Sequence, residues 1–183
     1  ATLTTGRSAA QLEVGWPGAY LTFLRGQNET LDVGGRIGFQ YGFEGRPEEV
    51  FPGVQLAGTA RLQLYRDARM VAGVRASPGL LLYFPNRVTS ILGVGIPVEA
   101  MGGYMILPNL SAHAGLSLPM SVLFMPRIAF YLPVQAGGGV EYRVDENLSL
   151  TADTRVGPLF RFEPRGPFTS VSFRVLLGAG YRF

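Results

Sequence analysis

The sequence contains one histidine, His113, and histidine is the side chain most often used as a general base near neutral pH. Ser111 and Ser117 share its parity, so in a strand all three side chains would point to one face. Glu99 lies several residue pairs farther from the turn at Pro108-Asn109, too far to orient the imidazole. We therefore interpret His113 as a packed or interior-lining residue and predict that the chain is not an enzyme.

Metal and cofactor chemistry lack the residues they need. Cysteine and lysine are absent, and one histidine with scattered carboxylates offers no spacing that converges metal ligands. Glycine pairs such as Gly34-Gly35 never precede a helix, as a phosphate-binding loop would require. The net charge of +3 has no basic run behind it, so nucleic acid is not expected as a partner. We expect no metal and no cofactor.

The composition favours a single all-β domain over residues 1–183. The chain is 47% hydrophobic and only 16% charged, yet no window approaches 18 apolar residues without a glycine, proline or charge. The 25 glycines and 13 prolines interrupt every stretch long enough to form a helix. The apolar residues must therefore be placed on strands.

The C-terminal residues alternate strictly between apolar and polar positions. The even positions are serine, arginine, glycine or Leu176, whereas every odd position is apolar: Val171, Phe173, Val175, Leu177, Ala179, Tyr181 and Phe183. Such a strand has one face for lipid and one for a polar interior, as the strands of a transmembrane barrel do.

The same alternation recurs along the chain, which predicts a closed antiparallel up-and-down transmembrane β-barrel. Strands are expected on both sides of the Trp16-Pro17-Gly18 turn and then at 31–43, 54–65, 69–84, 90–106, 110–124, 128–143, 148–162 and 170–183. Ten strands satisfy the even number that two termini on one side of the membrane require. Eight strands remain the alternative if residues 1–18 lie outside the wall.

The C-terminal Phe183, with Tyr181 two residues before it, resembles the terminal signature of Gram-negative outer-membrane β-barrels. The hairpin at 137–150 is similar to those of small barrels of the OmpA and OmpX type. The resemblance implies an outer-membrane location and insertion by the β-barrel assembly machinery, which would recognise Tyr181 and Phe183. Omptin-type proteases of this membrane place a histidine at the extracellular rim, where His113 is not expected.

Five prolines inside the expected strands depart from this pattern. Each removes a hydrogen-bond donor from the ladder, which ordinarily confines proline to edges or bulges. A closed barrel has no edges. We therefore expect bulges at Pro78, Pro97, Pro119, Pro133 and Pro158.

The interior of the expected barrel carries a network of charges of both signs. Its predicted members are Glu13, Asp32, Arg36, Arg61, Arg75, Glu99, Glu141, Arg143, Asp153, Arg155, Arg161, Arg174 and Arg182. Charges in a narrow lumen should pair, because an isolated ion away from bulk water is costly. One interpretation is a plug of salt bridges, and the other is a narrow, mildly anion-selective, porin-like pore.

Four arginines are expected in the loops on the side away from the termini: Arg46, Arg87, Arg127 and Arg165. Each would follow an aromatic residue at a strand end, at the height of the phosphates of lipopolysaccharide. We expect them to bind these phosphates. Together these features favour a structural, anchoring or interaction subunit of the cell envelope, with lipopolysaccharide and other envelope proteins as its partners.

Overall fold

The computed structural model describes residues 2–42, 52–85, 90–124, 128–163 and 166–183. Within them no helix is long and apolar enough to cross a membrane. The strands are β1 (Ser8–Trp16), β2 (Gly18–Gly26), β3 (Leu31–Gln40), β4 (Gly53–Arg66), β5 (Met70–Ala76), β6 (Gly79–Tyr83), β7 (Ile91–Leu107), β8 (Leu110–Leu123), β9 (Ala129–Pro133), β10 (Gln135–Arg143), β11 (Leu148–Glu163) and β12 (Gly166–Arg182).

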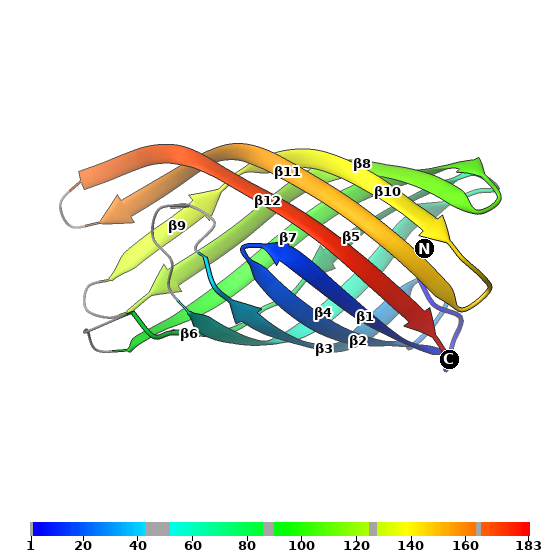
Figure 1. Ribbon diagram of the computed structural model, residues 1–183, viewed down its shortest axis with the longest axis horizontal. Helices are drawn as coiled ribbons and strands as arrows, with labels where there is room; N and C mark the ends of the chain where they lie inside the picture. The colour runs from blue at the N-terminus through cyan, green and yellow to red at the C-terminus, as the bar shows by residue number, and fades with distance from the viewer. Residues whose placement is uncertain (1, 43–51, 86–89, 125–127, 164–165) are drawn as a thin grey trace.

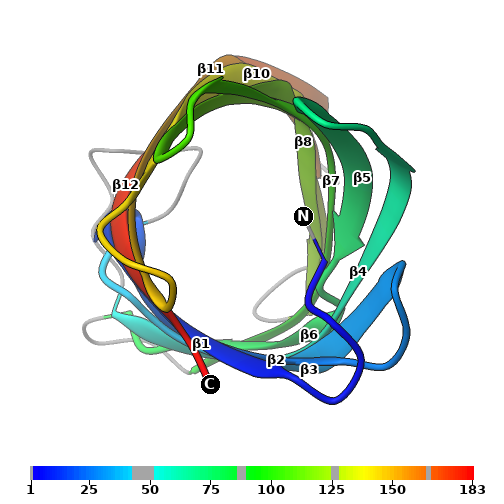
Figure 2. The ribbon, with the colours of Figure 1, turned by 90° about the vertical axis from the view of Figure 1, so that its right-hand side faces the viewer.

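These strands form one closed antiparallel barrel with ten strands in its wall (Figures 1 and 2). The wall has fewer strands than there are segments, because β5 continues into β6 across Ser77-Pro78 and β9 into β10 across Val134. The predicted architecture and strand number are confirmed. The eight-stranded alternative is wrong, since β1 lies in the wall between β2 and β12.

The last strand closes the barrel against the first. Ala10 pairs with Tyr181, and the backbones of Ser8 and Phe183 exchange two hydrogen bonds of 2.9 Å. The closing seam therefore leaves no exposed edge, which a wall in lipid requires because its backbone groups find no water there.

Strand β12 shows how the two faces of the wall divide. Val171 and Leu177 are 63% and 64% exposed, whereas Ser172 and Leu176 between them are 0% and 3% exposed. Because successive side chains of a strand point to opposite faces, odd residues cover the outside and even residues fill the lumen. The alternation read in the sequence is thus the division between outer face and lumen.

The connections between strands are divided between the two ends of the barrel. One end, which we call the turn end, holds the C-terminus, the N-terminal segment and the short connections around residues 27–30, 67–69, 108–109 and 144–147. The other, the loop end, holds the Trp16-Pro17-Gly18 turn and the connections after β3, β6, β8 and β11.

The expectation of bulges at the five strand prolines is wrong. Ala60 pairs with Ala76 and Ala57 with Gly79, so one register continues past Pro78. Pro97 pairs directly with Pro119 within an unshifted ladder. A proline loses its N–H but keeps its carbonyl, as where Ser77 N donates to Pro97 O at 3.0 Å. The cost is therefore a missing bond or a short strand break, not an inserted residue.

Candidate functional site

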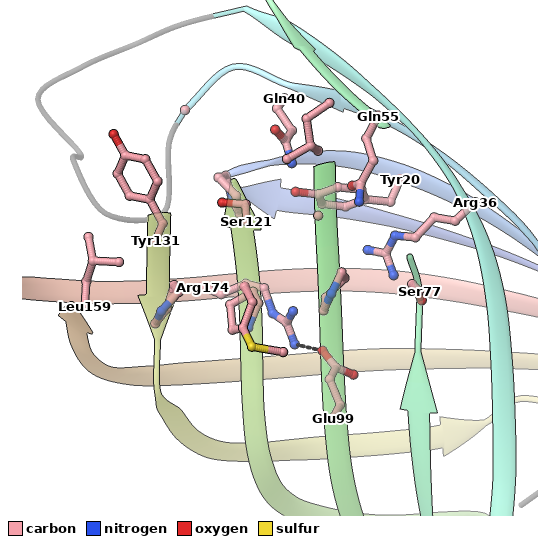
Figure 3. Close-up of a pocket in the computed structure, with 18 of the residues that line it drawn as sticks. Tyr20, Arg36, Gln40, Gln55, Ser77, Glu99, Ser121, Tyr131, Leu159 and Arg174 are labelled. Carbon is pink, nitrogen blue, oxygen red and sulfur yellow. Dashed lines mark hydrogen bonds and ion pairs between the residues drawn. The ribbon is translucent and has the colours of Figure 1, made fainter. Parts of the chain in front are cut away.

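The centre of the lumen is occupied by Glu99 and the three arginines around it. Glu99 extends from β7 and is 4% exposed. One carboxylate oxygen lies 2.6 Å from Arg75 on β5, and the other lies 2.7 Å from Arg174 on β12 and 3.7 Å from Arg155 on β11. Figure 3 shows the contact between Glu99 and Arg174. Arg75 lies directly opposite Glu99 on the neighbouring strand. The pairs with Arg155 and Arg174 cross the interior and join β7 to strands that are not its neighbours in the wall.

Asp153 on β11 extends this cluster toward the turn end. It lies 3.0 Å from Arg155 and 3.6 Å from Arg174, and 3.0 Å from Nε2 of His113 on β8. Gly139 stands between them, paired with His113 on one side and Asp153 on the other. Because glycine has no side chain, the imidazole reaches across β10. Sequence reasoning tested Glu99 on the preceding strand and missed this partner, although the glycine run 137–139 was a usable signal.

The remaining predicted lumen charges form separate pairs. Arg36 lies 3.2 Å from Glu13 and its guanidinium carbon 4.2 Å from the centre of the Tyr20 ring. Arg61 is 2.5 Å from Asp32, a fully buried carboxylate. Toward the ends of the barrel, two further pairs are partly exposed: Arg161 with Glu163, and Arg182 with Glu141.

Arg143 does not join the network to which the sequence assigned it. It is the last residue of β10, it is exposed, and it forms no ion pair with the described residues. Two physical reasons explain why Arg143 lacks an ion pair there. Water reaches the rim of the turn end, and the nearby carboxylate of Glu141 pairs with Arg182.

Above the charges, toward the loop end, the lumen is filled by apolar and aromatic side chains that sequence reasoning did not group. Leu81, Tyr83, Leu123, Ala129, Tyr131 and Leu159 form one cluster. Leu159 is 1% exposed. The inward-facing positions near the loop end are apolar in the sequence. This pattern could have predicted the cluster, but the sequence analysis considered only the charged inward positions.

A cavity of about 80 Å³ lies between the charges and the apolar cluster. Arg36, Arg75, Glu99 and Arg174 line it on the side of the charges, and four members of the apolar cluster line it on the other side: Leu81, Tyr83, Tyr131 and Leu159. In Figure 3, Arg36 and Arg174 extend from different strands into this space, and Arg174 is joined to Glu99.

The N-terminal segment lies over the turn end of the lumen. Leu3 is 7% exposed, and its backbone N–H donates to Oδ1 of Asp32 at 3.0 Å. Thr2 N donates to Gln63 Oε1 at 3.2 Å, and Gly6 N to Gly26 O at 2.9 Å. Figure 2, which looks into this end, shows the segment running inward from the wall.

The residues predicted for assembly and lipid contact are placed as follows. Tyr181 and Phe183 are 50% and 54% exposed on the outer face, with ring centres 6.3 Å apart. Arg46, Arg87, Arg127 and Arg165 lie outside the described residues. In the described part of the chain, no group of three or more acidic or histidine side chains is arranged to hold a metal ion.

The outer face of the closed wall is apolar all the way around. Its most exposed members include Ile37, Leu56, Leu80, Leu116, Val156 and Leu177, on six different strands. An apolar band of this extent cannot face water in a stable monomer and matches the lipid-facing surface of a membrane barrel. The wall is that of a transmembrane β-barrel.

No family model and no curated protein matches the chain. Among solved structures it is similar to the outer membrane protease OmpT from Escherichia coli, with 10% identity over 98% of this chain and 94% of that one, and a TM-score of 0.45. The N-terminal β-barrel domain of Pseudomonas aeruginosa OprF matches with 10% identity, 99% and 100% coverage, and a TM-score of 0.40. Yersinia pestis Ail matches with 13% identity, 98% and 100% coverage, and a TM-score of 0.27.

Proposed function

We propose that the chain is a non-conducting integral barrel of the Gram-negative outer membrane, acting as a structural, anchoring or interaction subunit of the cell envelope. The observation that carries this proposal is the ion cluster of Glu99, Arg75, Arg155 and Arg174 across the middle of the lumen. The apolar cluster and the N-terminal segment fill the lumen on either side of it. A lumen filled at three levels favours an anchor over a channel.

Catalysis is not part of the proposed role. Asp153 orients His113, but the same carboxylate is shared with Arg155 and Arg174. In the described part of the chain no hydroxyl is hydrogen-bonded to His113, so the imidazole has no nucleophile to activate. The imidazole belongs to the ion cluster.

The alternative function is a narrow, mildly anion-selective pore, favoured by the excess of arginine in the lumen. Planar-bilayer recording distinguishes the two roles. The purified barrel, shown to be inserted by its heat-modifiable migration on gels, should give no stable channel. Stable openings of nanosiemens size with a preference for anions would overturn the plug and support the pore.

Two contacts with the envelope extend this proposal. Tyr181 and Phe183 would engage the β-barrel assembly machinery, so changing both to Ser should lower the amount of barrel in the outer membrane. Arg46, Arg87, Arg127 and Arg165 would bind lipopolysaccharide phosphate. Replacing these four with Gln should lower the lipopolysaccharide that mass spectrometry finds in the purified barrel, and unchanged retention would contradict this contact.

A further inference from the structure

Arg25 is the only charged residue at a lipid-facing position of the described strands. Along β2, Thr22 and Leu24 are buried in the lumen, whereas Leu21 and Phe23 are exposed on the outer face. Arg25 continues the outward series and is exposed. The other charged residues of the described strands alternate with the lipid-facing residues and stand on the lumen side.

The strand register places Arg25 beside the closing seam, at the turn end of the barrel. Arg25 pairs with Ser8 on β1 and with Val33 on β3. The backbone of Ser8 is bonded in turn to that of Phe183 at the end of β12. Figure 2 marks the C-terminus next to β1 at this end. Ser8 therefore presents its hydroxyl on the same face as Arg25, between Arg25 and Phe183.

Three aromatic rings lie next to Arg25 on the lipid-facing surface. Ala10 on β1 pairs with Phe23 on one side and with Tyr181 on the other. The ring centres of Phe23 and Phe183 are 6.0 Å apart, and those of Tyr181 and Phe183 are 6.3 Å apart. The rings thus join β2 to β12 across the closing seam. A hydrocarbon chain that lies against them would begin close to the guanidinium of Arg25.

Tyrosines mark the height of the membrane boundary at the turn end. The exposed tyrosines of the described residues each lie within three residues of the end of a strand there: Tyr65, Tyr104, Tyr142 and Tyr181. Tyrosine favours the boundary between lipid and water, because its ring is apolar and its hydroxyl is polar. Arg25 stands two residues nearer the end of the barrel than Phe23, which shares the row of Tyr181. Its guanidinium therefore reaches the height of the lipid head groups.

No described carboxylate pairs with Arg25. Asp32 on β3 is close in the register, since it pairs with Gly26, but its side chain is buried in the lumen and bonded to Arg61. Gly26 N donates to Arg7 O at 2.9 Å, which brings a second exposed arginine to the same corner. Neither Arg7 nor Arg25 forms an ion pair with the described residues, so this corner of the turn end attracts an anion.

We propose that Arg25 binds the phosphate of a phospholipid from the leaflet at the turn end, with the Ser8 hydroxyl as a further donor and an acyl chain against Phe23 and Phe183. The planar guanidinium fork can donate two parallel hydrogen bonds to a phosphate. An arginine that faces lipid is costly at the bilayer midplane but not near its surface, where Arg25 lies. The proposal rests on the membrane placement of the wall and not on a closed lumen, so a conducting barrel would leave it unchanged.

Photolabelling tests this contact. The folded barrel in dodecyl maltoside micelles receives phosphatidylglycerol with a diazirine near the carboxyl end of one acyl chain. It is then irradiated, digested and examined by mass spectrometry. Label is expected on peptides of the β1–β2 hairpin, including the one with Phe23. Arg25→Gln should lower this label about fivefold, the ratio expected for one charge contact at a membrane surface.

The matched control is Arg143→Gln. Arg143 is also exposed at the turn end of a strand and forms no ion pair with the described residues, but it stands at a lumen-side position. Its replacement should leave the label on the β1–β2 hairpin unchanged. Heat-modifiable migration verifies that each variant is folded. Equal labelling of the hairpin in the Arg25 and Arg143 variants would overturn the site at Arg25.

The phosphate is tested by changing the ligand. Diacylglycerol with the same chains and diazirine should label the hairpin about fivefold less than phosphatidylglycerol, and Arg25→Gln should not lower that label further. Equal labelling by the two lipids would overturn the phosphate contact. Excess glycerol phosphate should leave the lipid label unchanged, whereas displacement would assign the site to free phosphate esters and overturn the lipid source.

Discussion

The middle and the loop end of the lumen are built on the same wall but filled with opposite chemistry. In the middle, Glu99 and Arg155 are buried at 4% and 2% exposure within ion pairs. Toward the loop end, Leu81 and Leu159 are equally buried, at 5% and 1%, in an apolar cluster. All four side chains point inward from strands, so strand geometry does not decide which filling is used.

The ion pairs and the apolar side chains differ in how strongly they constrain the register of the strands. An ion pair joins particular strands, as Glu99 on β7 joins Arg75 on β5 and Arg174 on β12. It therefore penalises any other register, because a slipped strand leaves a buried charge unpaired. Apolar side chains fill volume and tolerate rearrangement better. We infer that the middle of the lumen fixes the register and that the loop end supplies packing.

Removing the central carboxylate should have the largest effect. Glu99→Gln keeps the shape of the side chain but leaves Arg75, Arg155 and Arg174 without their shared anion. The free energy of unfolding should fall by about 3–5 kcal/mol, as for other broken buried pairs. Urea unfolding in vesicles, followed by the fluorescence of Trp16, the single tryptophan, measures this change.

The matched control for this change is Glu141→Gln at the rim. Glu141 and its partner Arg182 have side chains 33% and 39% exposed, so this pair should contribute about 1 kcal/mol or less. Similar losses for the two variants would mean that water reaches the middle of the lumen, and the contrast between the two fillings would fail.

Truncating the apolar filling should have a smaller effect. Leu159→Ala removes a side chain that is 1% exposed, and large-to-small changes in packed cores cost about 2–5 kcal/mol. We expect the lower part of that range, because the neighbouring cavity already interrupts the packing. Leu177→Ala on the lipid-facing surface is the control and should cost less, since lipid fills the space. Equal losses would contradict a packed cluster.

The sequence predicted the wall better than the lumen. Alternation of apolar and polar residues depends only on strand geometry, so Val171 through Phe183 located the outer face, and ten strands followed. The contact between His113 and Asp153 depends on which strands become neighbours and on the missing side chain of Gly139. The alternation of apolar and polar residues predicts neither of these. The prediction of bulges was wrong because the register of a strand is set by all the hydrogen bonds along its ladder. A proline removes only one donor from that ladder.

The smallest effect is expected for Asp145 at the turn end. Its carboxylate is exposed to water and belongs neither to the ion pairs in the middle of the lumen nor to the apolar cluster. Asp145 is exposed between β10 and β11, and its Oδ1 accepts from the N–H groups of Leu148 and Asn147 at 2.8 and 2.7 Å. These two hydrogen bonds favour the ionised carboxylate and hold the pKa of Asp145 below its ordinary value. A carboxyl group with a lowered pKa in the folded state stabilises the barrel above its unfolded pKa, and this stabilisation is lost as the pH falls through the folded pKa.

Asp145→Ala should therefore be slightly less stable than the unmodified chain at neutral pH, and the difference in the free energy of unfolding should shrink in acid. Urea unfolding curves measured over a series of pH values test this expectation. If the difference in the free energy of unfolding between Asp145→Ala and the unmodified chain stays constant into acid, the charge of Asp145 does not contribute to the stability of the turn end.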